Sequence, residues 1–76
     1  MEPDPFDPSL PSIRLLQTWI REQRILSMDL LEGHRLIGVL IWQDQHYLAL
    51  QPSDSEDPVM ISRQAMLQVR PLPRSL

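Results

Sequence analysis

The segment Leu30-Leu-Glu-Gly33-His-Arg-Leu-Ile-Gly38-Val-Leu-Ile-Trp-Gln-Asp44 is apolar and strand-like, and it holds the only two glycines of the chain. Gly33 follows Glu32 between two apolar runs, which predicts a tight hairpin turn with positive φ. Gly38 lies in the middle of the second run, where glycine predicts a sharp bend or the close approach of another backbone. A hairpin followed by a bent strand predicts the beginning of a very small β-barrel.

The length and composition set limits on the class of protein. The chain has 76 residues and no cysteine, so we expect one domain without disulfides or thiolate metal sites. Small folds without such cross-links often depend on oligomerisation. No apolar run reaches the roughly 20 residues that a membrane-spanning helix needs, so we expect no membrane insertion. The N-terminus lacks the basic region of a secretory signal, and we therefore expect a cytoplasmic protein.

The charges are unevenly distributed along the chain. The formal net charge is −3, and all seven basic residues are arginines. Six of the ten acidic residues lie in two irregular segments, 2–7 and 54–57, which leaves four acids against the seven arginines elsewhere. The folded body is therefore basic by this count, which allows either ordinary solvated charge or a surface that attracts nucleic acid.

Hydrophobic periodicity predicts one helix followed by five strands. Pro11 suits the first helical turn, Ser9 and Ser12 are candidate N-caps, and the helical pattern runs to about Gln23. The expected strands are 24–31, 34–43, 46–51, 59–61 and 66–70, with a solvent loop at 51–58 and a turn at 62–65. Pro73 predicts that 71–76 stay out of the sheet. The fold class is mainly β with an N-terminal α-helix, in the order α-β-β-β-β-β.

Three motifs carry a resemblance to a known family. They are Leu31-x-Gly33-His34-Arg35-Leu36-x-Gly38, Asp44-Gln45-His46 and Ser62-Arg63-Gln64-Ala65, and Ile20-Arg21-Glu22-Gln23 resembles the end of the family's helix. Together with the order of elements they resemble the Sm-like family, most closely bacterial Hfq. Two further segments, Leu10-Pro11-Ser12-Ile13-Arg14 and Trp42-Gln43-Asp44, resemble its divergent, cyanobacterial-type branch. The resemblance implies a strongly bent, five-stranded small barrel over 10–71, preceded by an acidic, proline-rich arm at 1–9 and followed by a tail at 72–76.

The resemblance also implies an assembly and a function. In the Sm-like family the fourth strand of one subunit pairs with the fifth strand of the next, so a homohexameric ring is expected. The residues at these positions are Val59, Met60, Ile61, Leu67 and Val69. Hfq-type rings bind RNA and act as post-transcriptional regulators or RNA chaperones, and uridine-rich single strands bind on the side of the helix.

At the family's functional positions, this chain has the typical residue type in some places and a different one in others. The expected RNA-binding residues are Gln45, His46, Arg63, Gln64 and Ser12, the expected rim residues are Arg21 and Arg24, and the expected structural residues are Gly33, Gly38 and Asp44. His46 stands where the family has an aromatic residue, and Gln64 where it has histidine. On the opposite face Asp29 stands where the family stacks an aromatic ring on adenine, and we expect its carboxylate to repel adenine-rich RNA.

Other functions remain as alternatives. The ring could act mainly as a scaffold for a protein partner, or the chain could be a lone small-barrel interaction domain without a ring. Neither a nucleophile elbow nor a glycine-rich phosphate loop occurs, and the two histidines are far apart without cysteine. We therefore expect no enzymatic activity, no cofactor, no metal site and no DNA binding.

Overall fold

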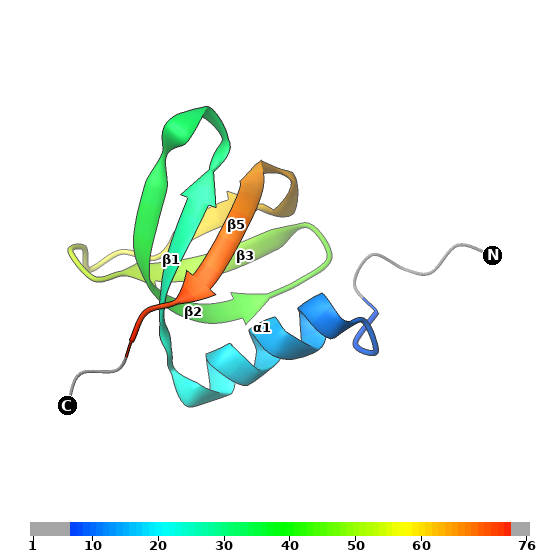
Figure 1. Cartoon of the computed structure of the whole chain (residues 1–76). Helices are drawn as coiled ribbons and strands as arrows, with labels where there is room; N and C mark the ends of the chain where they lie inside the picture. Colours follow the sequence, from blue (N-terminus) through cyan, green and yellow to red (C-terminus); the bar gives the residue numbers. More distant parts are fainter. Residues whose placement is uncertain (1–6, 74–76) are drawn as a thin grey trace.

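The computed structural model describes residues 7–73, so 1–6 of the expected arm and 74–76 of the expected tail lie outside the described residues. Helix α1 leads into a single antiparallel sheet (Figure 1). The elements are α1 Pro11–Glu22, β1 Ile25–Leu30, β2 Arg35–Gln43, β3 Tyr47–Pro52, β4 Val59–Ser62 and β5 Met66–Pro71, with short 3₁₀ turns η1 Leu31–Gly33 and η2 Arg63–Ala65. The predicted order of one helix and five strands is confirmed.

Helix α1 begins without the expected serine cap. Leu10 is the N-cap residue and makes no side-chain capping bond, while Pro11 occupies the first turn as predicted. The prediction of Ser9 or Ser12 as N-cap was wrong, because the Ser9 hydroxyl donates to Asp7 Oδ1 at 2.8 Å and Ser12 already lies inside the helix. The helix buries Ile13 and Leu16 and ends at Gln23 in the left-handed conformation.

The sheet is strongly bent and does not close. Its strand order is β4-β3-β2-β1-β5, so β4 and β5 form the two outer edges. Strand β2 pairs with β1 through Arg35–Val39 and with β3 through Gly38–Gln43. Gly38 and Val39 therefore have partners on both sides, and the strand bends where it passes from one neighbour to the other (Figure 1).

Both glycine predictions are confirmed. Gly33 has a φ of +78° and follows Glu32 at +66°, so the β1–β2 hairpin turns through two left-handed residues. A Cβ atom on Gly38 would lie 2.1 Å from the carbonyl oxygen of Gln51 and 2.8 Å from Pro52 Cα. The backbone of β3 thus approaches β2 so closely that any side chain at Gly38 would overlap it.

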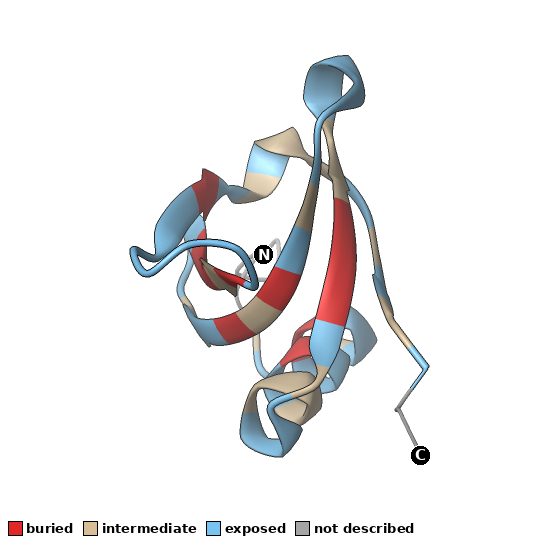
Figure 2. Ribbon diagram, turned by 90° about the vertical axis from the view of Figure 1, so that its left-hand side faces the viewer, coloured by how far each residue is buried: buried red, intermediate tan, exposed pale blue. Residues whose placement is uncertain are grey.

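The core lies between the two halves of the bent sheet and one face of α1 (Figure 2). The largest fully buried side chains are Leu26, Met28, Leu40, Leu48 and Leu50, and Leu16 of α1 and Ile61 of β4 join the same cluster. Trp19 and Ile20 pack against this cluster while remaining partly exposed. Within residues 7–73, no helix has the length and apolar character required to cross a bilayer.

The end of β5 differs from the sequence prediction. Pro71 is the last residue of β5 and pairs with Leu26, so the expectation that 71–76 leave the sheet is wrong at Pro71. The Leu72 N–H, just beyond the strand, donates to the Ile25 carbonyl at 2.9 Å. The Leu26–Pro71 pair is of the non-hydrogen-bonded kind, because the bond from Leu72 to Ile25 flanks it. The proline nitrogen therefore faces the open edge, where no ladder bond is lost.

Replacing each glycine by alanine should separate the two physical constraints. Gly38→Ala should lower the free energy of unfolding by roughly 3 kcal/mol or more, because the new methyl group meets backbone that cannot move aside alone. Gly33→Ala should cost only about 1 kcal/mol, since its site is open and only the positive φ opposes a side chain. Urea unfolding at one fixed protein concentration measures both, and equal costs would contradict the close-approach explanation.

Candidate nucleic-acid interface

The β2–β3 connection and turn η2 enclose a hollow of about 450 Å³. Its lining residues are Gln45, His46, Tyr47, Ser62, Arg63 and Gln64. The fold thus brings together four of the five residues expected to bind RNA, from two segments far apart in the sequence. The fifth, Ser12, is exposed in the first turn of α1 and does not line this hollow.

Asp44 shapes the β2–β3 connection. Its Oδ1 accepts hydrogen bonds from the backbone N–H groups of His46 at 2.9 Å and Tyr47 at 2.8 Å, and its own N–H donates to the Tyr47 carbonyl at 2.9 Å. The two bonds to the carboxylate, first that from His46, lower the pKa of Asp44 below its ordinary value of 3.8. The charged carboxylate therefore holds the backbone that presents His46.

Arg63 joins η2 to the β2–β3 connection. Its N–H donates to the His46 carbonyl at 2.9 Å, its Nε to the Asp44 carbonyl at 2.6 Å, and its Nη2 to Gln43 Oε1 at 2.5 Å. Partial burial lowers the pKa of Arg63, and the nearby charge of Asp44 opposes this effect. A guanidinium remains protonated despite such a shift, so the hollow has one fixed positive charge in its wall.

Three side chains in the hollow are available to a ligand. Gln45, His46 and Gln64 are exposed, and within 7–73 their side chains make no hydrogen bond. An imidazole ring can stack on a base, and the amides can donate to and accept from base edges. The hollow therefore offers stacking, base-edge recognition and one positive charge.

Tyr47 and Gln43 belong to this region but were not identified from the sequence. Tyr47 lines the hollow beside His46 and is 41% exposed, so it adds an aromatic surface. Its position directly after Gln45-His46 was a signal that could have found it. Gln43 makes its contacts with residues 20 and more positions away, and no local pattern indicates these.

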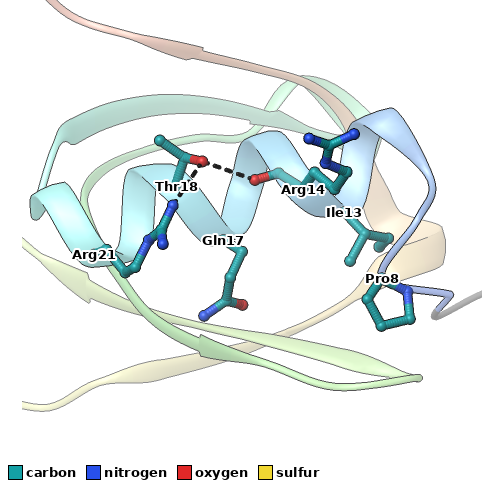
Figure 3. A pocket seen from close by; sticks show the side chains of 6 residues that line it. All are labelled: Pro8, Ile13, Arg14, Gln17, Thr18 and Arg21. Atoms are coloured by element: carbon teal, nitrogen blue, oxygen red, sulfur yellow. Dashed lines mark hydrogen bonds between the residues drawn. The ribbon is translucent and has the colours of Figure 1, made fainter.

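The two arginines expected at the rim have different surroundings. Arg21 lines a second hollow, of about 430 Å³, with Pro8, Ile13, Arg14, Gln17 and Thr18 (Figure 3). Its Nη2 donates to Thr18 Oγ1 at 3.3 Å. Arg24 is half-buried, and its Nη2 donates to the Leu72 carbonyl at 3.1 Å beside the end of β5. Of the two, only Arg21 lies on an open surface.

On the hairpin side, Asp29 forms an ion pair with Arg35, with 2.7 Å between Oδ1 and Nε. The pair lies beside a hollow of about 430 Å³ that Gly33, His34 and Leu67 also line. Because Arg35 neutralises the carboxylate locally, repulsion of phosphate is a weaker argument against RNA here than the sequence suggested. The absence of an aromatic ring from the Asp29 position is the stronger argument.

The edge strands expose apolar side chains. Val59 and Met60 on β4 are 36% and 59% exposed, and Leu67 on β5 is 66% exposed. Ile61 is buried in the core and Val69 is half-buried against it, so these two side chains expose less apolar surface than Val59, Met60 and Leu67. Exposed apolar side chains along unpaired edges are typical of strands that pair with another chain.

Comparison with known proteins agrees with this architecture. Residues 10–71 match the protein family described as "Hfq related". The crystal structure of an Hfq protein from Anabaena sp. is similar with a TM-score of 0.74 and 30% sequence identity, over 84% of this chain and 100% of that chain. A crystal structure of the pleiotropic translational regulator Hfq has a TM-score of 0.71 and 17% identity, over 78% and 86% of the two chains, which is a likeness of fold. A search of curated proteins found no significant match.

The Asp44 turn should make stability depend on pH. Asp44→Asn keeps an acceptor oxygen but removes the charge, so the wild type should melt at a higher temperature than this variant at pH 7. Because folding lowers the pKa of Asp44, its contribution is full above the ordinary value of 3.8 and disappears as the pH falls through the lowered value. Melting curves of both proteins between neutral and strongly acidic pH should therefore converge, and a constant difference would contradict the role of the charge.

Proposed function

This chain belongs to the Hfq-related family of Sm-like proteins, and on that premise we propose that it forms a homohexameric ring that binds uridine-rich, single-stranded RNA. We assign this role to the domain at 10–71 and propose post-transcriptional regulation in the cytoplasm, without enzymatic activity. The observation that carries the proposal is the gathering of Gln45, His46, Arg63 and Gln64 in one hollow.

The chemistry of the hollow supports a single-stranded RNA ligand. Flexible strands leave their bases unstacked, and protein side chains can then stack on them and bind their edges. We propose that His46, with Tyr47 beside it, provides the stacking surface and that Gln45 and Gln64 bind base edges. Arg63 provides a charge for a phosphate group. Ser12 and the rim residues Arg21 and Arg24 have secondary roles in this proposal. The hydrogen bond from Arg24 to the Leu72 carbonyl supports weak RNA binding at the rim, because it engages this side chain within the subunit.

The two unpaired edges support the ring. Pairing β4 of one subunit with β5 of the next is a heterologous contact, which closes into a ring when the rotation between subunits permits. The pairing would cover Met60 and Leu67 and would satisfy the open backbone groups of both edges.

The alternative is a ring that mainly holds a protein partner. The observation that favours it is the exposure of Trp42 and Ile41 on the outside of β2, at 41% and 44%. Aromatic and apolar groups exposed in this way are common at protein–protein interfaces. Trp19 and Ile20 support the alternative less, because both pack against the core.

The mass in solution tests the ring. Six copies of an 8.9 kDa chain should give about 53 kDa by light scattering after size exclusion. Leu67→Arg should reduce this mass, because a charge on β5 opposes burial in the contact while the side chain is 66% exposed in the subunit. Ile41→Arg makes the same change on β2, away from both edges, and should leave the mass unchanged. A monomeric wild type would contradict the ring.

Binding of fluorescent oligo-U and oligo-A across a salt series tests the RNA proposal. Oligo-U should bind more tightly than oligo-A and should weaken as salt rises, because phosphate contacts release counterions. His46→Ala should lower oligo-U affinity roughly fivefold or more through lost stacking. His34→Ala is the matched control, because His34 is exposed in the hollow of the opposite face. No oligo-U binding at low salt would favour the scaffold, and equal effects of the two substitutions would contradict the assigned hollow.

A further inference from the structure

Gln43 lies outside the hollow but bonds to the arginine in its wall. We propose that Gln43 is a positioning residue, which fixes the Arg63 guanidinium for a phosphate and ties it to α1. This inference rests on the proposed RNA-binding function. It assigns a role to a residue that the sequence pattern does not connect to RNA binding.

The side-chain amide of Gln43 bridges three elements. Gln43 is the last residue of β2 and is half-buried. Its Nε2 donates to the Ile13 carbonyl at 3.3 Å and to Gln17 Oε1 at 3.1 Å, both on α1. Its Oε1 accepts from Nη2 of Arg63 in η2 at 2.5 Å. One amide therefore joins the helix, the end of β2 and the wall of the hollow.

The partners allow only one orientation of this amide. The Ile13 carbonyl can only accept a hydrogen bond, and the Arg63 guanidinium can only donate one. Nε2 must therefore face the helix, and Oε1 must face the arginine. Glutamate at this position would keep the bond to Arg63 and lose the donor to Ile13, while methionine would lose both.

The bond from Gln43 completes the fixing of Arg63. The Nε of Arg63 donates to the Asp44 carbonyl and its Nη2 donates to Gln43, so two points of the planar group are held. Two anchors on a rigid plane set the orientation of the whole guanidinium. When a phosphate binds a guanidinium that is already fixed, the arginine side chain loses less conformational entropy than a mobile arginine would lose.

The bridge also couples the hollow to the helix. Gln17 accepts from Gln43 and lines the second hollow on α1 (Figure 3). A shift of α1 at Ile13 or Gln17 would therefore reach Arg63 through a single side chain. This gives the helix a direct influence on the charge that faces the RNA.

The first test measures Arg63 in the intact protein without RNA. Solvent exchange of the Arg63 Nη2 protons, followed by NMR, should be about fivefold faster in Gln43→Met than in the wild type, since the hydrogen bond from Nη2 to Gln43 is lost. Gln43→Glu should restore slow exchange, because the carboxylate still accepts from Nη2. Gln68→Met is the matched control, since Gln68 is exposed on β5 and should leave the exchange unchanged. Unchanged exchange in Gln43→Met would overturn the proposal.

The second test measures oligo-U affinity in two backgrounds. Gln43→Met should lower affinity about fivefold in the wild type and should have no further effect on Arg63→Ala, because both changes act through one group. The ring mass should stay constant throughout. An equal loss in both backgrounds would overturn the positioning role. If the wild type itself does not bind oligo-U, the proposed function fails, while the exchange measurement still decides whether Gln43 holds Arg63.

Discussion

The close approach of β3 to Gly38 is the constraint on which the rest of this small structure depends. A single strand, β2, pairs with β1 through its first half and with β3 through its second half, and both pairings include Gly38. With no side chain at this residue, the Gln51 carbonyl can occupy the space where a Cβ would lie. The bend that follows turns one sheet back on itself, so that Leu26 and Met28 of β1 share a core with Leu48 and Leu50 of β3. A domain of 76 residues buries only a small core, so its stability depends on this cluster.

The candidate site follows from this bend. Beyond Gly38, β2 continues to Gln43, and Asp44 then turns the chain into β3. Strand β4 pairs with β3 and is followed by the turn η2. Pairing of Tyr47 with Ser62 brings the two turns together, and Arg63 then bonds to the carbonyls of both Asp44 and His46. The same arginine therefore stabilises the fold and supplies charge to the hollow. The exposed side chains beside it, His46 and Gln64, carry less of the structure, so they can differ from the usual family residues without loss of the fold.

The sequence predicts the backbone of this protein better than its side-chain network. Gly33 and Asp44 act locally, through a positive φ and a short turn. Gly38 acts through the space that the β3 backbone occupies, but its place in the middle of an apolar run already indicated this. The serine cap failed because a nearby residue competes for the hydroxyl: Asp7 accepts its hydrogen bond. The exclusion of Pro71 from the sheet failed because the open edge of β5 accommodates the proline nitrogen. The bridge through Gln43 depends on contacts between segments 20 to 30 positions apart, which a single sequence does not encode in any local pattern.

The distribution of charge over the surface also depends on contacts that the sequence does not reveal. Counting residues outside the acidic segments makes the body basic, yet several arginines have structural partners: Arg24 at Leu72, Arg35 at Asp29 and Arg63 at Asp44 and Gln43. Arg14, Arg21 and Arg70 are exposed, and they come from α1 and β5 rather than from the hollow. The positive field near His46 thus comes mainly from one fixed guanidinium per subunit. A ring repeats that charge at regular intervals, and a strand of RNA that follows the ring can meet each copy in turn. Under the proposed function, recognition by such a surface would depend on the placement of Arg63 more than on the net charge of the protein.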